Sequence, residues 1–295
     1  MSINDMHLEQ IQFFETILFE SVGQEVHVSG YQFMGGGNIN NAVSLDTDQG
    51  YFFVKWNESG QTDAFSCEAS GLELLRRANE IPIPEVIGFG QNYQKAYLIL
   101  EYIHSSRPQY NYWERFGHSL ARLHTHTNHS FGLSHNNYIG SLQQINTPAE
   151  KWVEFFVEKR LKIQAGLALY NGELPKALFN KFEDLYKELP HMLPAAVPSL
   201  LHGDLWSGNV MVGPTGEVML IDPAVYYGNR EAELAFTKLF GGFPDNFYGA
   251  YNEISPLEPD FDERAAIYNL YPLLVHVNLF GSGYLSGIEK VLKRF

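Results

Sequence analysis

The residues best suited to chemistry lie close together between positions 201 and 222. Asp204 and Asn209 are five residues apart, and Asp222 follows Asn209 by thirteen residues, just after the apolar run 218–221. A carboxylate can take a proton from a hydroxyl group, and carboxylate and amide oxygens are ligands that suit Mg²⁺. We therefore expect Asp204 to act as a catalytic base and Asn209 and Asp222 to bind a metal ion.

This order and spacing match those of enzymes that transfer phosphoryl groups. The protein-kinase pattern H-R-D-L-x-x-x-N places a metal-binding asparagine five residues after an aspartate base, and here the segment runs from His202 through Asp204 to Asn209. The transferred group carries negative charge on three oxygens, so catalysis depends on cations and alignment. Each short motif alone could be a turn or a strand end, but their combination favours the catalytic interpretation.

A glycine-rich loop for a nucleotide is predicted upstream, between the strand-like runs 26–34 and 39–45. Glycine lets the backbone approach phosphate oxygens closely. The loop matches neither G-x-G-x-x-G nor G-x-x-x-x-G-K-[ST], which argues against a P-loop NTPase and leaves an ordinary hairpin turn as the alternative. The predicted nucleotide-binding residues of this loop are Gly35, Gly36, Gly37 and Asn38.

Lys55 ends the strand-like run 51–55, and we expect it to contact the α- and β-phosphates. A lysine at a strand end can also be just a solvated charge, so this role needs a partner that holds the side chain in place. Glu68, in the first turns of a helix predicted over residues 63–79, is the candidate for an ion pair with Lys55.

A hinge between two lobes is predicted where the strand 97–103 gives way to the polar stretch 104–108. Backbone groups near Glu101, Tyr102 and Ile103 would then bind the adenine edge. An ordinary core strand is the alternative interpretation.

The predicted elements define an α+β protein with a two-lobed fold like that of protein kinases. A small N-terminal lobe at 1–103 would hold a helix over residues 1–22, three to five antiparallel strands and the helix with Glu68. A larger lobe at 104–295 would be mainly helical, with the catalytic loop between its third and fourth helices. The helices predicted there are 113–124, 148–169, 175–189, 231–240 and 260–280.

Four longer segments resemble the fructosamine (ketosamine) kinase family. They read H-G-D-L-W-S-G-N from position 202, D-P-A-V-Y-Y-G-N-R-E from 222, E-L-A-F-T-K-L-F-G-G-F from 233 and N-L-F-G-S-G-Y-L from 278. The resemblance covers nearly the whole chain. The wider relatives are the aminoglycoside phosphotransferases and choline kinases, which do not usually carry a tryptophan at the position of Trp206.

The resemblance implies a kinase that uses ATP and Mg²⁺ to phosphorylate the third-carbon hydroxyl of a ketosamine, such as a fructosamine or a ribulosamine, as a step in protein deglycation. A phosphotransferase for an aminoglycoside, choline or another amino alcohol is the alternative. A nucleotide-binding module without catalysis is a third possibility, which the presence of the base and both metal ligands disfavours.

The resemblance also implies that Trp206 and His276 line the sugar pocket. Each has a structural alternative, since Trp206 could only pack the loop and His276 could be a core histidine. Tyr226 and Tyr227 could contact substrate or could simply be half-buried tyrosines.

Two positions depart from the family pattern. Asn229 stands where members commonly have histidine, and Asn38 stands in the region where some members carry cysteine. A role for that histidine and a thiol switch in the glycine-rich loop are therefore not expected here.

The remaining histidines are interpreted as structural. His124, His126 and His129 do not share one helix face, so we expect a solvated helix end or loop and not a zinc site. His202 is expected to organise the catalytic loop. Pro223 and Ala224 replace the Phe-Gly of the D-F-G motif, and no A-P-E segment follows, so we expect a site that assembles without phosphorylation.

Composition limits the possible partners. The 295 residues can bury a large core, and a net charge of −14 argues against nucleic acid or an anionic membrane as partner. The single Cys67 excludes an internal disulfide, and we see neither a signal-type N-terminus nor an apolar span of about 18 residues. We expect a cytoplasmic enzyme for a small-molecule or protein-linked glycated amine, with no prediction of oligomeric state.

Overall fold

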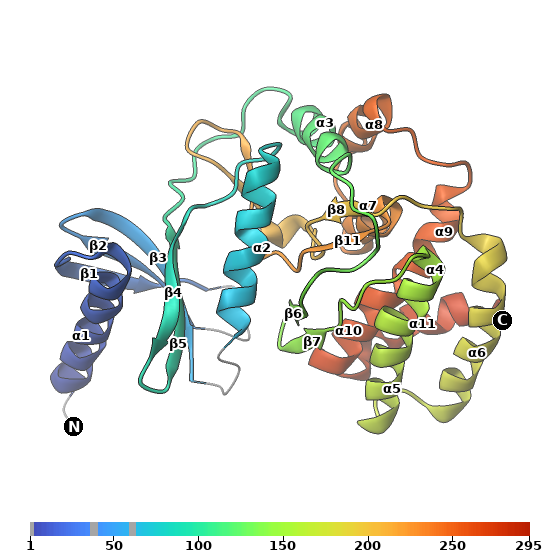
Figure 1. The fold of residues 1–295 in the computed structure, drawn as a ribbon, viewed down its shortest axis with the longest axis horizontal. Helices are drawn as coiled ribbons and strands as arrows, with labels where there is room; N and C mark the ends of the chain where they lie inside the picture. Colours follow the sequence, from blue (N-terminus) through green and yellow to red (C-terminus); the bar gives the residue numbers. More distant parts are fainter. Residues whose placement is uncertain (1–2, 36–40, 59–62) are drawn as a thin grey trace.

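The computed structural model describes residues 3–35, 41–58 and 63–295, and these form a smaller sheet-containing lobe and a larger helical lobe (Figure 1). This arrangement confirms the predicted α+β, two-lobed fold. The predicted boundary after residue 103 stays a prediction, although it falls in the irregular segment that joins the last strand of the sheet to the next helix.

The smaller lobe is built on an antiparallel sheet with the strand order β1-β2-β3-β5-β4 within the described residues. The helix α2 connects β3 to β4. The elements of this lobe are α1 (Ile3–Val22), β1 (Val28–Phe33), β2 (Asn41–Thr47), β3 (Gly50–Asn57), α2 (Ala64–Ala78), β4 (Val86–Asn92) and β5 (Lys95–Glu101).

Helices cover both faces of this sheet, α1 on one and α2 on the other. Side chains alternate between the two faces along each strand. Tyr97 and Ile99 of β5 pack in one cluster with α1, while Leu98 and Leu100 pack in another with α2. Val54 and Trp56 of β3 belong to the α1 cluster. The residue between them, Lys55, is therefore turned toward α2.

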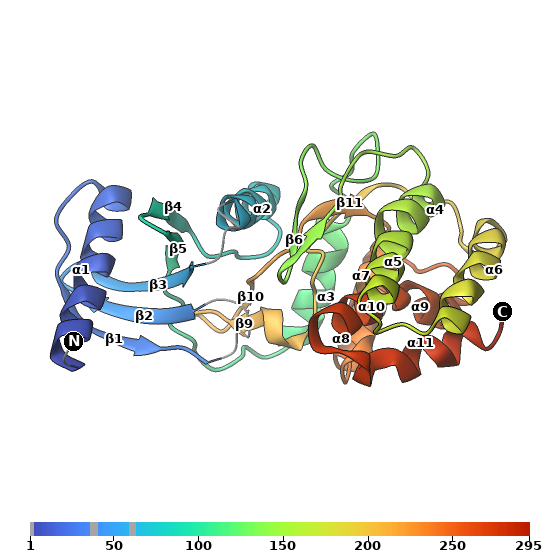
Figure 2. The same ribbon diagram turned by 90° about the horizontal axis from the view of Figure 1, so that it is seen from below.

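The larger lobe is mainly helical and, among the described residues, also contains three short antiparallel strand pairs, β6 with β7, β8 with β11 and β9 with β10 (Figures 1 and 2). Its helices are α3 (Tyr112–Leu123), α4 (Trp152–Phe155), a π-helical segment (Phe156–Leu161), α5 (Lys162–Tyr170), α6 (Lys176–Met192), α7 (Arg230–Leu239), α8 (Asp245–Ile254), α9 (Phe261–Tyr268), α10 (Leu270–Phe280) and α11 (Leu285–Leu292). Its strands are β6 (Asn137–Ile139), β7 (Leu142–Gln144), β8 (Ser199–Leu201), β9 (Val210–Val212), β10 (Val218–Leu220) and β11 (Tyr226–Gly228).

Two predicted helices are divided. The helix predicted over 148–169 begins only at Trp152 and continues as α4, the π-helical segment and α5. The helix predicted over 260–280 breaks at Asn269 into α9 and α10. Pro272 explains the second break, because its ring lacks an N–H and is tolerated only in the first turn of a helix.

The helices α8 and α11 were not predicted. The sequence of α8 is rich in aromatic residues, glycine and asparagine, which are weak helix formers. Its stability comes from packing against α3, where Gly117 lets the two backbones approach so closely that a Cβ would collide with the Phe247 carbonyl oxygen. Tertiary contact therefore decides this element.

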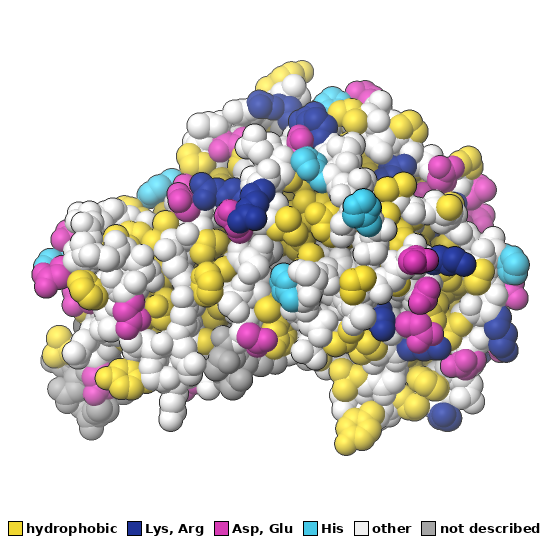
Figure 3. Space-filling view, in the orientation of Figure 1, with side chains coloured by type: hydrophobic (Ala, Val, Ile, Leu, Met, Phe, Trp, Pro, Cys, Tyr) yellow, Lys and Arg dark blue, Asp and Glu magenta, His cyan; other side chains and the backbone are white. Residues whose placement is uncertain are grey.

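The described part of the chain contains no helix that is both long and apolar enough to cross a membrane. On the face shown in Figure 3, acidic side chains are scattered over both lobes.

Candidate active site

Short strands bring the predicted catalytic residues together. Asp204 follows β8 and Asp222 precedes β11, and these two strands pair with Tyr226 opposite Leu201. The β9–β10 hairpin lies between them and closes with a hydrogen bond of 3.1 Å from the Ile221 N–H to the Asn209 carbonyl. The spacing of thirteen residues is thus the length of a hairpin that returns the chain to the same place.

Asn209 links the predicted base to the predicted metal ligand. Its side-chain Nδ2 donates hydrogen bonds to the Asp204 carbonyl oxygen at 2.7 Å, to Asp204 Oδ2 at 3.0 Å and to the Asp222 carbonyl oxygen at 3.5 Å. Desolvation raises the pKa of Asp204 to about 7, with Asn209 opposing the shift and the Asp222 and Glu233 carboxylates adding to it. A pKa near neutrality suits a general base.

Lys55 is buried and holds two carboxylates. Its Nζ lies 2.9 Å from Glu68 Oε1 and 2.5 Å from Asp222 Oδ1. Burial by itself lowers the pKa of Lys55, but the charges of Glu68 and Asp222 outweigh it and raise that pKa above its usual value. The structure thus brings Lys55 together with the partner that the sequence suggested, and adds Asp222 to the same cluster.

The donor set at this point suits Mg²⁺, which prefers carboxylate and amide oxygens and retains several waters. The Asp222 side chain is 44% exposed, so its carboxylate can coordinate a metal ion in addition to its bond with Lys55. The side-chain nitrogen of Asn209 donates to Asp204, so the Oδ1 atom of Asn209 remains available to coordinate a metal ion.

Five rings form a continuous aromatic wall beside the catalytic loop. Ring centroids lie 6.5 Å apart for Trp206 and Phe240, 4.7 Å for Phe240 and His276, 5.0 Å for His276 and Tyr284, and 5.5 Å for His276 and Phe280. Trp206 stands over Gly208, where a Cβ would collide with the indole ring. The structure therefore brings Trp206 and His276 to one wall, although they are seventy residues apart in the chain.

Phe240, Phe280 and Tyr284 of this wall were not among the predicted site residues. A signal for them existed, because all three lie inside the E-L-A-F-T-K-L-F-G-G-F and N-L-F-G-S-G-Y-L segments. Residue type alone did not separate them from core aromatics.

The hydrogen bond of His276 defines what its ring can do. Its Nδ1 lies 2.7 Å from the Pro272 carbonyl oxygen, so this nitrogen carries the proton and donates it. Burial lowers the pKa of His276, which keeps the ring neutral. The remaining Nε2 is then a hydrogen-bond acceptor.

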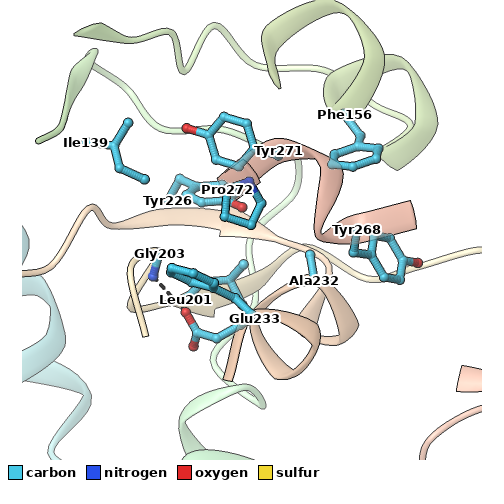
Figure 4. A pocket seen from close by; sticks show the side chains of 11 residues that line it. Ile139, Phe156, Leu201, Gly203, Tyr226, Ala232, Glu233, Tyr268, Tyr271 and Pro272 are labelled. Atoms are coloured by element: carbon cyan, nitrogen blue, oxygen red, sulfur yellow. Dashed lines mark hydrogen bonds between the residues drawn. The ribbon is translucent and has the colours of Figure 1, made fainter. Parts of the chain in front are cut away.

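Glu233 supports the catalytic loop from α7 and was missed by sequence reasoning. Its carboxylate accepts hydrogen bonds from the backbone N–H groups of His202 at 3.2 Å and Gly203 at 2.7 Å, and lies 2.9 Å from His124 Nε2. Figure 4 shows Glu233 beneath Gly203, beside a small cavity lined mainly by aromatic and apolar side chains. Burial raises the pKa of Glu233, but the bonds from His124 and the loop outweigh it and hold that pKa below its usual value.

The histidines have defined structural positions. His124 is buried between Glu233 and Tyr251, with its Nδ1 2.7 Å from the Tyr251 hydroxyl oxygen. The expectation of a solvated helix end was therefore wrong for His124. His202 bonds through Nε2 to the Ile221 carbonyl oxygen at 2.9 Å and through Nδ1 to the Asp204 N–H at 3.3 Å. These bonds agree with the predicted role in organising the loop.

The two tyrosines after Asp222 lie differently. Tyr226 is buried more deeply than the predicted half-buried alternative, with the Arg160 guanidinium carbon 4.2 Å from its ring centroid. Tyr227 is half-buried and pairs with Leu200 in the β8–β11 ladder. Asn229, which departs from the family pattern, is the N-cap of α7, where it accepts a hydrogen bond from the Glu231 N–H at 2.9 Å.

Only part of the predicted nucleotide site can be described. Gly35 is exposed after β1, whereas Gly36, Gly37 and Asn38 lie outside the described residues. At the hinge, the Glu101 N–H donates to the Glu85 carbonyl oxygen at 2.9 Å, so this N–H is not available to an adenine edge. The Tyr102 ring packs against Tyr51 and His104, and Ile103 follows it in irregular backbone.

A two-lobed fold in which a lysine, a glutamate, two aspartates and an asparagine converge defines a phosphotransferase of the protein-kinase-like class. Within that class the chain belongs to the fructosamine kinase family, whose sequence pattern matches residues 10–295. This match confirms the family resemblance and the enzyme class.

Relatives in several organisms support the same assignment. A probable ketoamine kinase of Synechocystis is 38% identical over 279 residues, which are 93% of either chain. A protein-ribulosamine 3-kinase of Arabidopsis thaliana, named as chloroplastic, is 37% identical over 94% of this chain and 85% of its own.

Solved structures agree in fold. Proteins of Haemophilus somnus and Thermobifida fusca, both named as fructosamine-3-kinases, are 30% and 33% identical with TM-scores of 0.86 and 0.85, each covering 95% of this chain and 96% of its own. An aminoglycoside phosphotransferase has a TM-score of 0.62 at 15% identity, over 95% of this chain and 98% of its own, and shows the fold alone.

Proposed function

We propose that the protein is a ketosamine kinase that transfers the γ-phosphoryl group of ATP, in the presence of Mg²⁺, to the third-carbon hydroxyl of a fructosamine or ribulosamine. The observation that carries this proposal is the convergence of two bonded pairs, Lys55 with Asp222 at 2.5 Å and Asn209 with Asp204 at 3.0 Å, beside the aromatic wall. The names of the relatives support the ketosamine as acceptor.

Each residue of the site has its own role in the proposed phosphoryl transfer. The acceptor hydroxyl oxygen forms a bond to the γ-phosphorus while the bond to the ADP oxygen breaks, and Asp204 receives the hydroxyl proton. Lys55, held by Glu68, positions and neutralises the phosphates. Mg²⁺, held by Asp222 and Asn209, would neutralise further charge on the phosphates.

The aromatic wall binds the acceptor in this proposal. Trp206 and Phe240 offer apolar surface to the carbon faces of a sugar, and His276 Nε2 accepts a hydrogen bond from one of its hydroxyl groups. This places a hydroxyl group beside the catalytic loop that carries Asp204.

Turnover on four acceptors tests the proposal. With MgATP, we expect phosphorylation of fructosamine-lysine or ribulosamine-lysine, with product NMR locating the new phosphate on the third carbon, and little turnover of kanamycin or choline. The Asp204→Asn variant is the control for contaminating kinases. Preferred turnover of kanamycin or choline would instead favour the aminoglycoside or amino-alcohol phosphotransferase.

A further inference from the structure

The β6–β7 hairpin lies between the two lobes, next to α2 (Figure 2). It belongs to the larger lobe, yet it is bonded both to α2, which carries Glu68, and to the segment that follows Asp222. None of the reactions assigned above uses its side chains. Its bonds suggest that it holds other parts of the site.

Two buried amides bind the hairpin to the Asp222 segment. Asn137 Nδ2 donates to the Val225 carbonyl oxygen at 2.8 Å, and Gln144 Nε2 donates to the Ala224 carbonyl oxygen at 3.0 Å. Both amides are themselves fixed, because Asn137 Oδ1 accepts from Gln144 at 2.9 Å and Gln144 Oε1 accepts from the Tyr271 hydroxyl at 2.7 Å. Each donor can therefore reach only one position of the segment.

The segment needs such support. Asp222 has a φ of +55°, a left-handed conformation that residues other than glycine seldom adopt and that persists only when its surroundings hold it. Pro223 follows and has no N–H to donate. Lys55 and Asn209 bond Asp222 itself. The residues after Pro223 are held by the two amides and by the bond of 2.9 Å from the Ala224 N–H to the His202 carbonyl oxygen.

The next residue of β6 points to the opposite face of the hairpin and reaches the smaller lobe. The Tyr138 hydroxyl donates to Asp63 Oδ1, just before α2, at 2.7 Å. This bond raises the pKa of Tyr138 to about 12, so the phenol keeps the proton that it donates. The side chain of Asp63 makes no capping bond to α2, which leaves its carboxylate to Tyr138.

The helix α2 also packs directly on the Asp222 segment. Glu68 and Gly71 are three residues apart and share a helix face. A Cβ at Gly71 would lie 3.2 Å from a methyl carbon of Val225, the residue whose carbonyl Asn137 holds. Glu68 and Asp222, the two partners of Lys55, are therefore connected in two further ways. The helix α2 packs directly on Val225, and the hairpin links Asp63 to Val225 through Tyr138 and Asn137.

We propose that the β6–β7 hairpin is a strut between the lobes, and that Tyr138 and Asn137 are positioning residues for the Lys55–Glu68–Asp222 cluster. Its catalytic consequence rests on the proposed function. The strut would do constantly what a phosphorylated activation loop does on demand in protein kinases, which is to keep the glutamate helix against the lysine.

Tyr138→Phe tests the strut with little risk to folding, because the bond that it removes lies at the surface. We expect the KM for ATP and the calorimetric Kd of MgATP to rise about threefold to tenfold, as for the loss of one hydrogen bond of ordinary strength. The KM for the sugar acceptor and the melting temperature should stay unchanged. The matched control is Tyr186→Phe, since the Tyr186 hydroxyl has no hydrogen-bond partner in the described structure.

A double-mutant cycle identifies the bond. Asp63→Ala should weaken MgATP binding as Tyr138→Phe does, and the double variant should be little worse than either single one. Fully additive effects, unchanged MgATP binding, or a lower melting temperature with unchanged kinetics per folded molecule would each overturn the strut.

Asn137→Asp tests the buried end, because it retains the acceptor oxygen for Gln144 but removes the donor to Val225. We expect a larger rise in the Kd of MgATP than for Tyr138→Phe. If this variant does not fold, the Tyr138 and Asp63 variants decide alone.

Hydrogen exchange separates failure of the strut from failure of the proposed function. The amides of α2 should exchange faster in Tyr138→Phe than in Tyr186→Phe, even if the parent chain binds no MgATP or prefers another acceptor. Equal exchange of α2 in the two variants would overturn the strut and leave the proposed function untouched.

Discussion

At the scale of single residues, Asp204 has surroundings that suit a base. Protein surrounds its carboxylate and carboxylates lie nearby, which raises its pKa to about 7, while Asn209 holds one oxygen. An asparagine in its place could still accept the bond from Asn209 but could not take a proton. The effect of that substitution should therefore fall on chemistry and spare nucleotide binding.

We expect Asp204→Asn to lower kcat by at least about 10²-fold with little change in the affinity for MgATP. Steady-state kinetics and calorimetry measure the two quantities separately. Near-normal turnover would show that Asp204 is not the base.

The two proposed metal ligands, Asp222 and Asn209, should differ in how much they contribute to Mg²⁺ binding. Asp222→Ala removes a charge and a partner of Lys55, whereas Asn209→Ala removes a neutral amide. We expect the first variant to weaken Mg²⁺-dependent ATP binding more than the second, because a carboxylate contributes more to the binding of a hard cation. Calorimetry with ATP in the presence and absence of Mg²⁺ checks this order, and equally mild losses would argue against both ligands.

The aromatic wall should affect the acceptor alone. Trp206 is 38% exposed and His276 lies in the same wall, so neither substitution by alanine should reduce the melting temperature strongly. We expect Trp206→Ala and His276→Ala to raise the KM for a ketosamine by about tenfold, on the scale of a lost aromatic or hydrogen-bond contact, with an unchanged KM for ATP. A large fall in melting temperature with unchanged kinetics would make that residue structural.

At the scale of elements, close packing of α3 against α8 supports the core of the larger lobe. Gly117 allows this approach, and its neighbours across the contact are backbone atoms of α8 that cannot move aside. We expect Gly117→Ala to lower the free energy of unfolding by about 1–3 kcal/mol, as overpacking does. Denaturant unfolding measures the change.

Gly166→Ala on α5 is the control for this substitution, because no atom lies within 4 Å of the added Cβ. Alanine favours a helix over glycine by about 1 kcal/mol, so this variant should be neutral or more stable. Equal losses in the two variants would contradict the packing argument.

Elements also show where sequence reasoning reached its limit. Lys55 and Glu68 were identified because a lysine at the end of a strand and a glutamate in the first turns of the next helix are local patterns. The helix α8 escaped because its residues form helices poorly and depend on α3. Glu233 escaped because its partners at 202 and 203 are backbone N–H groups, which leave no trace in residue type.

At the scale of the whole molecule, Lys55 contacts both Glu68 and Asp222 and joins the two lobes at the site. The segment after Asp222 has no D-F-G phenylalanine that could swing out of place. We therefore expect enzyme made in bacteria to keep full activity after phosphatase treatment. A marked loss in a turnover assay, compared with mock-treated enzyme, would reveal a phosphorylation switch.

The sequence by itself determined which side chains are available for the proposed chemistry and in what order they follow one another. Asp204, Asn209 and Asp222 lie on consecutive short strands and turns, so their spacing carries most of their geometry. The family followed from segments whose residue types are specific, Trp206 above all, and the match over residues 10–295 confirms it.

Only the tertiary structure decided which groups surround that chemistry. Phe240, His276 and Tyr284 form one wall with Trp206, and Asn137 and Tyr138 bind segments from different lobes. These contacts join residues far apart in the chain, and they depend on how helices and hairpins pack. The physical reason is that a local pattern specifies an element and its buried face, whereas the partner that covers the face is chosen by the packing of the whole chain.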